Sequence, residues 1–260
     1  MLLAIDIGNT NIHIGVYNQS DWCCSWRVRT IREKMSDEYA VLLRNFFEEN
    51  GFGFGDIEHV VIASVVPDLT SAFVELVERY LQPSPLLITH ETDSGVRLLL
   101  DNPREIGPDR IVNAAAAKVL YGGPAIVIDF GTATTFDVIN TDGDYLGGVI
   151  TTGIGLAHDA LVSRAARLLA VDIAPPPAAI GRNTIHAMQS GLFLGYVSMI
   201  EGLVERIKVE LNEPEVRVIG TGGLAPLFAQ HTSVIQDLSD SLTLEGLRII
   251  WERHHSNSTR

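Results

Sequence analysis

A short motif occurs twice in this chain of 260 residues, and the two copies lie nearly half of the chain apart. The copies run from Ala4 to Thr10 and from Val127 to Ala133, and both contain Ile-Asp-x-Gly. Each copy ends the first of three short apolar segments that predict strands, and helical spacing follows both sets. A duplicated meander of this kind predicts two similar α/β domains that face a central cleft.

Hydrophobic spacing and turn residues place the other elements. We set the domain boundary between the repeats, so that residues 1–110 and 111–260 form the two domains. Three prolines at 175–177 predict a rigid loop, and residues 256–260 predict a frayed tail. Strands are predicted over 2–6, 12–17, 22–28, 57–66, 86–88, 125–129, 134–140, 145–151 and 216–219, and helices over 36–50, 67–81, 109–120, about 156–168, 184–211 and 242–253.

Composition excludes several classes of partner. Hydrophobic residues make up 46% of the chain and charged ones 20%, which suffices for a sizeable core and argues against disorder. The formal net charge is −13, whereas nucleic acids and anionic membranes require a basic surface. A small polyanion held by backbone N–H groups remains compatible with this charge.

The location of the protein is predicted from its cysteines and apolar segments. Cys23 and Cys24 are adjacent, which suits neither a structural disulfide nor a metal site and fits a reducing compartment. The N-terminal segment has no basic start or cleavage site, and the uncharged stretch 183–200 is interrupted by polar residues and glycines. We therefore expect a soluble cytoplasmic protein without a membrane span.

The two motif copies are candidate phosphate loops. Gly8 allows close approach of a ligand, and Asn9, Thr10 and Asn11 supply donors, although an ordinary hairpin turn favours the same residue types. The second copy at Asp129 weighs against the plain turn, because turn geometry gives no reason for two such loops at equivalent places. Each aspartate then requires a cation beside phosphate. A third glycine turn, 220–223, follows a predicted strand.

Residues 102–110 form another candidate site. Asp109 suits the start of a helix, but the positive charge of Arg110 opposes the helix dipole there. An acid and a base side by side suit either a helix start or a site for a polar anionic substrate. His13 lies after the first loop, and the eight histidines show no metal-binding pattern. Motifs of P-loop proteins, α/β-hydrolases and zincins are absent from the sequence.

Duplicated Asp-x-Gly-x-Thr loops with a third glycine turn resemble the superfamily of acetate and sugar kinases, Hsp70 and actin. This resemblance implies duplicated ribonuclease H-like (actin-like ATPase) domains, each a mixed sheet flanked by helices. A more specific set of motifs is similar to type III pantothenate kinases and covers nearly the whole chain. These motifs are Asp6-x-Gly8-Asn9-Thr10, Asn102-Pro103, Gly107-x-Asp109-Arg110-x-x-Asn113-Ala114, Asp129-x-Gly131-Thr132-Ala133-Thr134, Gly147-Gly148-x-Ile150-x-x-Gly153, Gly181-x-Asn183-Thr184 and Leu242-Thr243-Leu244-x-Gly246-Leu247.

The resemblance implies ATP-dependent phosphorylation of pantothenate, the first step towards coenzyme A, in a homodimer that needs potassium or ammonium, with Mg²⁺ accompanying ATP. It assigns Asp109 as proton acceptor and Asp129 as ligand of the monovalent cation, while Asp6 meets Mg²⁺ through phosphate. Thr184 is a further substrate contact. The implied ATP-binding residues are Asp6, Ile7, Gly8, Asn9, Thr10, Asn11, Ile12, His13 and Thr132, and the pantothenate loop is Gly107, Pro108, Asp109 and Arg110.

The chain departs from the family pattern at two positions. Leu100 stands where the family commonly has a tyrosine, so one substrate contact is lost or supplied otherwise. Pro108 replaces the usual alanine, which stiffens the loop and removes one N–H donor. The alternatives are a related kinase for a sugar or short-chain acid, a non-catalytic regulator, and an actin-like or Hsp70-like ATPase. The loop motifs around Asp109 and Thr184 argue against a kinase for a sugar or short-chain acid. The three retained aspartates argue against a non-catalytic regulator. The chain is too short for the insertions and the peptide-binding domain of an actin-like or Hsp70-like ATPase.

Overall fold

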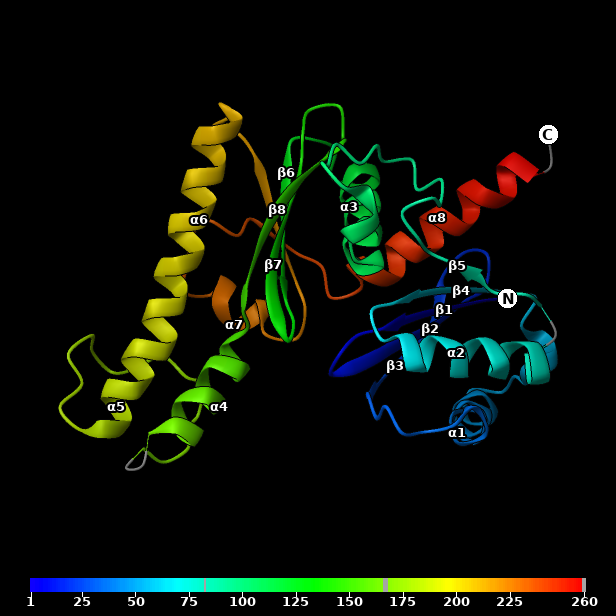
Figure 1. Ribbon diagram of the computed structural model, residues 1–260, viewed down its shortest axis with the longest axis horizontal. Helices are drawn as coiled ribbons and strands as arrows, with labels where there is room; N and C mark the ends of the chain where they lie inside the picture. The colour runs from blue at the N-terminus through cyan, green and yellow to red at the C-terminus, as the bar shows by residue number, and fades with distance from the viewer. Residues whose placement is uncertain (82, 166–167, 259–260) are drawn as a thin grey trace. The chain divides into compact units, whose positions relative to one another are not determined.

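The computed structural model describes residues 1–81, 83–165 and 168–258, which form two compact units (Figure 1). Unit 1 contains residues 1–120 and 241–260, and unit 2 contains residues 121–240. Each unit is a five-stranded mixed sheet flanked by helices, which confirms the predicted fold class. The division differs from the predicted boundary because two helices, one before residue 121 and one after residue 240, pack with the first sheet.

The sheet of unit 1 has the strand order β3-β2-β1-β4-β5. The first three strands form the predicted antiparallel meander, and β4 and β5 continue the sheet in parallel to β1. Nearly all of β1 is buried on both faces, as expected for a central strand with helices on each side. The strands are β1 (Leu2–Ile7), β2 (Asn11–Tyr17), β3 (Trp22–Arg29), β4 (His59–Ser64) and β5 (Leu86–Leu87).

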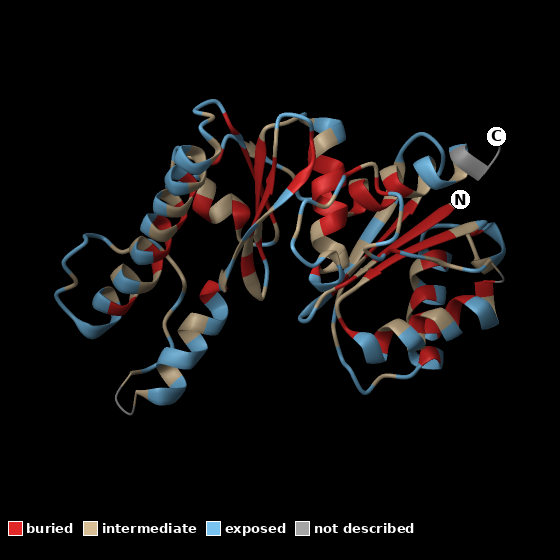
Figure 2. Ribbon diagram, turned by 45° about the horizontal axis from the view of Figure 1, so that its top comes forward, coloured by how far each residue is buried: buried red, intermediate tan, exposed pale blue. Residues whose placement is uncertain are grey.

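Two pairs of helices belong to this sheet. Helices α1 (Ser36–Glu49) and α2 (Pro67–Leu76), which continues as a π-helical turn to Leu81, pack their aromatic residues against Leu3, Ile5 and Ile7. Helices α3 (Pro108–Leu120) and α8 (Leu242–Ser258) contact each other and the strands β1 and β4. Figure 2 shows buried residues along the strands, on one side of α1 and α2, and over most of α3.

Unit 2 repeats the order of unit 1 in its sheet, β10-β9-β6-β7-β8. Its first three strands are again an antiparallel meander, and β9 and β10 lie parallel to β6. The internal repeat in the sequence is therefore a repeat of topology. The elements are β6 (Ala125–Phe130), β7 (Ala133–Ile139), β8 (Tyr145–Thr152), α4 (Ile154–Arg164), α5 (Thr184–Gln189), α6 (Gly195–Leu211), β9 (Arg217–Thr221), α7 (Ala225–Ala229) and β10 (Asp237–Leu238).

Helices α5 and α6 join through a π-helical segment, Ser190–Leu194, into one helix over Thr184–Leu211. By length and composition alone this helix could cross a membrane, a criterion that core helices of soluble proteins also meet. Phe193, Ile200 and Val204 on this helix lie in the core of unit 2. Its apolar character is therefore partly used in packing against its own sheet.

Two predicted helix ends differ from the structure. The helix predicted to reach residue 168 ends at Arg164, and residues 166 and 167 of that prediction lie outside the described residues. The frayed tail predicted from residue 256 is wrong as far as Ser258, because α8 continues through it, and residues 259 and 260 lie outside the description. His59 explains part of this extension, since its ring lies 4.6 Å from that of His255 and 5.0 Å from that of Trp251.

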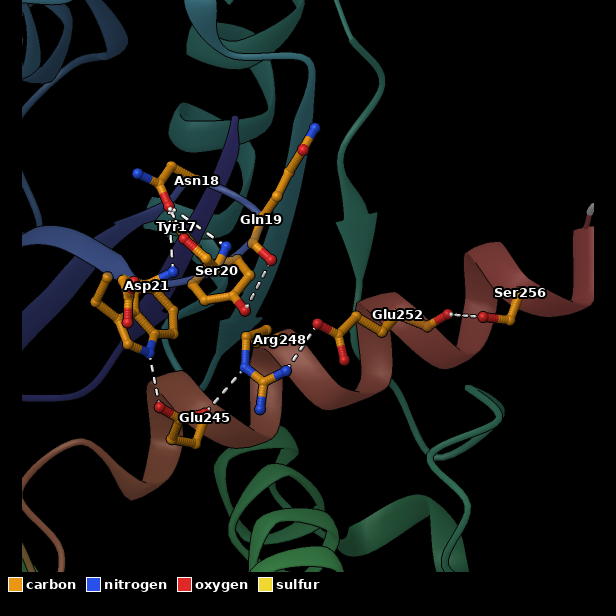
Figure 3. Close-up of polar contacts among 10 residues, drawn as sticks. Tyr17, Asn18, Gln19, Ser20, Asp21, Glu245, Arg248, Glu252 and Ser256 are labelled. Atoms are coloured by element: carbon orange, nitrogen blue, oxygen red, sulfur yellow. Dashed lines mark hydrogen bonds and ion pairs between the residues drawn. The ribbon is translucent and has the colours of Figure 1, made fainter.

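Polar contacts hold α8 against the β2–β3 hairpin (Figure 3). The indole Nε1 of Trp22 donates a hydrogen bond of 2.7 Å to Glu245. Arg248 pairs with Glu245 and Glu252 on its own helix and lies over the ring of Tyr17, 5.3 Å from its centre. These contacts tie residues that are more than 200 positions apart, so the C-terminal helix is an integral part of unit 1.

Helices α3 and α8 approach closely at a glycine. A Cβ atom added to Gly246 would lie 2.1 Å from the carbonyl oxygen of Val112. Nearby, Thr243 donates a hydrogen bond of 2.9 Å to the buried side chain of Asn113. The glycine in this helix therefore serves close packing and not helix formation, for which glycine is unfavourable.

Gly246→Ala should lower the thermal midpoint, because the added methyl forces α3 and α8 apart at a cost of about 1–3 kcal/mol. The control is Gly202→Ala in α6, where an added Cβ meets nothing within 4 Å and alanine favours the helix. Scanning calorimetry of both variants measures the difference. A midpoint for Gly246→Ala equal to that of Gly202→Ala would contradict this account of the packing.

Candidate functional site

The first predicted phosphate loop lies at the end of β1. Asp6 is opposite His13 on β2 and Ala63 on β4, and Gly8 follows directly after the strand. The backbone N–H of Gly8 donates a hydrogen bond of 3.0 Å to the carbonyl of Asn11, which closes the loop. Of the residues predicted to bind ATP, Ile7 and Ile12 are buried in the core, so they can present only backbone groups. Asn9, Thr10 and Asn11 are exposed, and Asp6, Gly8 and His13 are half-buried.

The predicted substrate loop around Gly107 lies at the same end of this sheet as the first loop. Strands β1 and β4 are parallel with Ile7 opposite Ser64, and the N–H of Val65 donates a hydrogen bond of 3.0 Å to Ile7. A Cβ atom on Gly107 would lie 3.5 Å from the side chain of Val65. The structure thus brings the loops of Gly8 and Gly107 to one end of the β1–β4 pair, although about one hundred residues separate them.

Asp109 sits in the first turn of α3. Its carboxylate accepts a hydrogen bond of 2.9 Å from the N–H of Arg110, and it lies against Gly107, where a Cβ would be only 2.4 Å from Oδ1. Burial of the carboxyl group raises the pKa of Asp109 above its usual value, and the N–H and charge of Arg110 only partly oppose this. Pro108 begins the helix, where a missing N–H leaves no helical hydrogen bond unmade.

The second loop follows β6 in unit 2. Asp129 is opposite Thr135 on β7 and Thr221 on β9. Gly222, with φ of +89°, directly follows β9, and a Cβ there would lie 2.7 Å from Oδ1 of Asp129. Only glycine tolerates both this backbone conformation and this proximity. The third glycine turn is therefore adjacent to the second phosphate loop.

Gly153 completes the surroundings of the second loop. Its N–H donates a hydrogen bond of 3.1 Å to the carbonyl of Thr132, and a Cβ would lie 2.4 Å from that oxygen. Behind the loop, the buried hydroxyl groups of Thr134 and Tyr196 form a hydrogen bond. Gly153 belongs to one of the family motifs but has no predicted role. No pattern in the sequence predicts that Tyr196 lies beside this loop.

Thr184 lies elsewhere in unit 2, at the start of α5. Asn183 caps this helix by accepting a hydrogen bond of 2.8 Å from the N–H of His186, and Gly181 packs directly on the backbone of Ala187. Both Asn183 and Thr184 are exposed and line a cavity of about 700 Å³ between α4 and α5. Its lining residues are Leu161, Leu168, Gly181, Arg182, Asn183, Thr184, Ala187, Met188, Gly191 and Leu192.

No group of three or more histidine, cysteine or acidic side chains suited to a metal ion occurs among the residues that the structure describes. Asp6 and Asp129 therefore offer one carboxylate each within their own loops. A cation at either place has to complete its coordination with other oxygen atoms, such as those of backbone carbonyls, water or phosphate.

Two mixed sheets of identical strand order, each with an Asp-x-Gly loop after its first strand, define a protein of the actin-like fold. Comparison with solved structures supports the fold. A protein from Campylobacter jejuni described as a Baf family transcriptional activator aligns over 98% of this chain and 99% of its own, with a TM-score of 0.64 and 17% identity. One from Sinorhizobium meliloti described as a 2-dehydro-3-deoxygalactonokinase aligns over 97% and 96%, with a TM-score of 0.55 and 13% identity.

Sequence comparison identifies the family. The family description "Type III pantothenate kinase" matches residues 2–206. The type III pantothenate kinase of Roseiflexus sp. (strain RS-1) is 50% identical over 256 residues, which cover 98% of this chain and 100% of that protein. The chain belongs to the type III pantothenate kinase family.

Asp109→Asn should stabilise the protein at neutral pH. Since the pKa of Asp109 is raised in the folded state, the native fold loses stability as pH rises from the unfolded value of about 3.9 through the raised folded value. The amide side chain of the Asp109→Asn variant does not ionise, so the variant does not lose this stability as pH rises. The thermal midpoint of the variant should therefore exceed that of wild type at pH 7, and the difference should shrink towards pH 4.

The control for this prediction is Asp101→Asn, which neutralises an exposed aspartate in the preceding loop. It should leave the thermal midpoint unchanged at both pH values. A lower midpoint for Asp109→Asn at pH 7 would show that the carboxylate stabilises the fold and would contradict the assigned direction of the pKa shift.

Proposed function

We propose that this chain transfers the γ-phosphoryl group of ATP to the primary hydroxyl of pantothenate, giving 4'-phosphopantothenate in the first step of coenzyme A biosynthesis. The observation that carries this conclusion is the match to type III pantothenate kinases over nearly the whole chain. The three aspartates at positions 6, 109 and 129 are all present, so the chain lacks none of the acidic groups that the reaction is proposed to use.

Asp109 is the proposed proton acceptor. In a loose phosphoryl-transfer transition state the hydroxyl loses its proton late, so the acceptor must mainly be well placed. The hydrogen bond from the Arg110 N–H and the contact with Gly107 fix the carboxylate, and its raised pKa makes it a better acceptor than an exposed aspartate. Arg110 is proposed to bind the pantothenate carboxylate, because a planar guanidinium can pair with both oxygens.

The two Asp-x-Gly loops are the proposed ATP phosphate sites. Their glycines allow the backbone N–H groups to approach phosphate oxygens closely. Asp6 is proposed to face Mg²⁺ that accompanies ATP, and Asp129 is proposed to bind potassium or ammonium. When bound, these cations supply positive charge between carboxylate and phosphate. The oxygen atoms of both side chains are ligands that such cations prefer.

Asp109→Asn should reduce turnover about 10²- to 10⁴-fold, because the amide cannot accept the proton. A coupled assay of ADP release with and without pantothenate, in potassium or sodium, measures this. Asp101→Asn should retain wild-type turnover, and Asp129→Asn should lose the difference between the two salts. Release of ADP from sugars or short-chain acids, and not from pantothenate, would contradict the proposed substrate.

The oligomeric state is proposed to be a homodimer that unit 2 forms. Exposed apolar side chains occur on α4, on the segment that leads to α5 and on α5 itself, including Ile180 at 84% and Ile185 at 56% exposure. The 700 Å³ cavity lies between the same elements. Exposed apolar residues grouped in this way are typical of interaction surfaces.

The free thiols of Cys23 and Cys24 agree with the proposed cytoplasmic location.

Ile185→Asp should convert the dimer into a monomer, because a charge in an apolar interface loses its hydration without a partner. Light scattering after size-exclusion chromatography measures the mass. The control is Val209→Asp on α6, where the side chain is 70% exposed but lies outside this surface. A wild-type protein that elutes as a monomer at micromolar concentration would rule out the dimer.

A further inference from the structure

We propose that Thr30, which follows β3, is a positioning residue for the first phosphate loop. It fixes the loop in the conformation that presents backbone N–H groups to the phosphates of ATP. This inference rests on the proposed role of the loop as a phosphate site, and it adds a residue that none of the sequence motifs contains.

Thr30 holds the loop through two hydrogen bonds. Its hydroxyl donates to the carbonyl of Gly8 at 2.6 Å, and its backbone N–H donates to the carbonyl of Thr10 at 2.9 Å. The second of these extends the β2–β3 ladder beyond the pair Asn11–Arg29. The first is a side-chain contact that only a residue with a hydroxyl group can make here, so the identity of residue 30 matters to the loop.

The direction of these bonds decides where the loop presents its donors. A trans peptide is planar, and its C=O and N–H groups point in opposite directions. The carbonyl of Gly8 shares a peptide with the N–H of Asn9, and the carbonyl of Thr10 shares one with the N–H of Asn11. With both carbonyls directed at Thr30, the two N–H groups point away from it. Backbone N–H groups that point to one side of a turn, as these of Asn9 and Asn11 do, offer donors to an anion.

The segment that carries Thr30 is itself anchored. The hydroxyl of Tyr39, a residue only 1% exposed in the core of unit 1, donates a hydrogen bond of 3.2 Å to the carbonyl of Ile31. Arg32 donates a hydrogen bond of 3.0 Å to the side chain of Asn9. Helix α1 thus supports residue 31 through its buried Tyr39, and residues 30 and 32 on either side of residue 31 contact the loop. Hydrogen bonds of the neighbouring residues therefore hold Thr30 in its position beside the loop.

The test compares Thr30→Val, which has the same shape without a hydroxyl, with Thr30→Ser, which keeps the donor. Thr30→Val should raise the KM for ATP about tenfold, the effect of one lost hydrogen bond. It should weaken binding of Mg²⁺-ADP equally and leave adenosine binding and the KM for pantothenate within twofold. Thr30→Ser should restore ADP affinity to within about threefold of wild type. Thr30→Ala repeats the loss of the hydroxyl without the second γ-methyl group of valine, but it also removes the γ-methyl group of threonine.

The matched control is Thr92→Val, because Thr92 is also a half-buried threonine whose hydroxyl bonds to loop backbone, away from the phosphate loop. It should bind Mg²⁺-ADP as wild type does. Thr30→Val with unchanged ADP affinity, or with equal losses for ADP and adenosine, would overturn the inference. Asp6→Asn separates the two hypotheses. If it weakens Mg²⁺-ADP binding while Thr30→Val does not, only the role of Thr30 fails, and if neither weakens binding the loop is not the phosphate site.

Discussion

The parallel pairing of β1 with β4, and of β6 with β9, decides where chemistry can occur in each unit. The carboxyl ends of parallel neighbours meet at one edge of a sheet, and ligands of open α/β sheets bind at that edge. In unit 1 this pairing brings Gly8 and the Val65–Gly107 contact together, and in unit 2 it brings Asp129 beside Gly222. The loops, the buried Asp109 and the glycine contacts all depend on these two registers.

A net charge of −13 is compatible with this arrangement because the loops present few negative groups to a ligand. Each Asp-x-Gly loop is held partly by contacts from backbone to backbone, as between Gly8 and Asn11 or Gly153 and Thr132. Glycine permits such distances, and backbone N–H groups carry no dependence on side-chain charge. The overall acidic field disfavours extended polyanions, whereas a nucleotide at the proposed phosphate loops would interact mainly with these local dipoles.

Local patterns in the sequence predicted much of this structure. The strands of both meanders follow from apolar runs and turn residues, and the internal repeat predicted two sheets of one topology. The domain boundary could not be predicted in this way, because α8 joins unit 1 through contacts such as Trp22–Glu245 that leave no local signal. Thr30 was missed for the same reason, since a threonine at a strand end is ordinary until its partner Gly8 is known. The tail over residues 256–260 was expected to fray because chain termini are poorly ordered unless they are held in place. The ring contacts of the preceding His255 with Trp251 and His59 could not be read from the sequence.

The return of α8 to the first sheet makes unit 1 discontinuous in sequence, with unit 2 inserted between its parts. During synthesis the first 120 residues emerge without the helix that covers the apolar side of α3 and of the strands β1 and β4. That side, which includes the buried residue Val112 against Gly246, stays uncovered until α8 has left the ribosome. Unit 2 is continuous and can fold beforehand. Unit 1 is therefore completed only after unit 2 has been synthesised, and a protein shortened before residue 241 would have a second loop but an unfinished first unit.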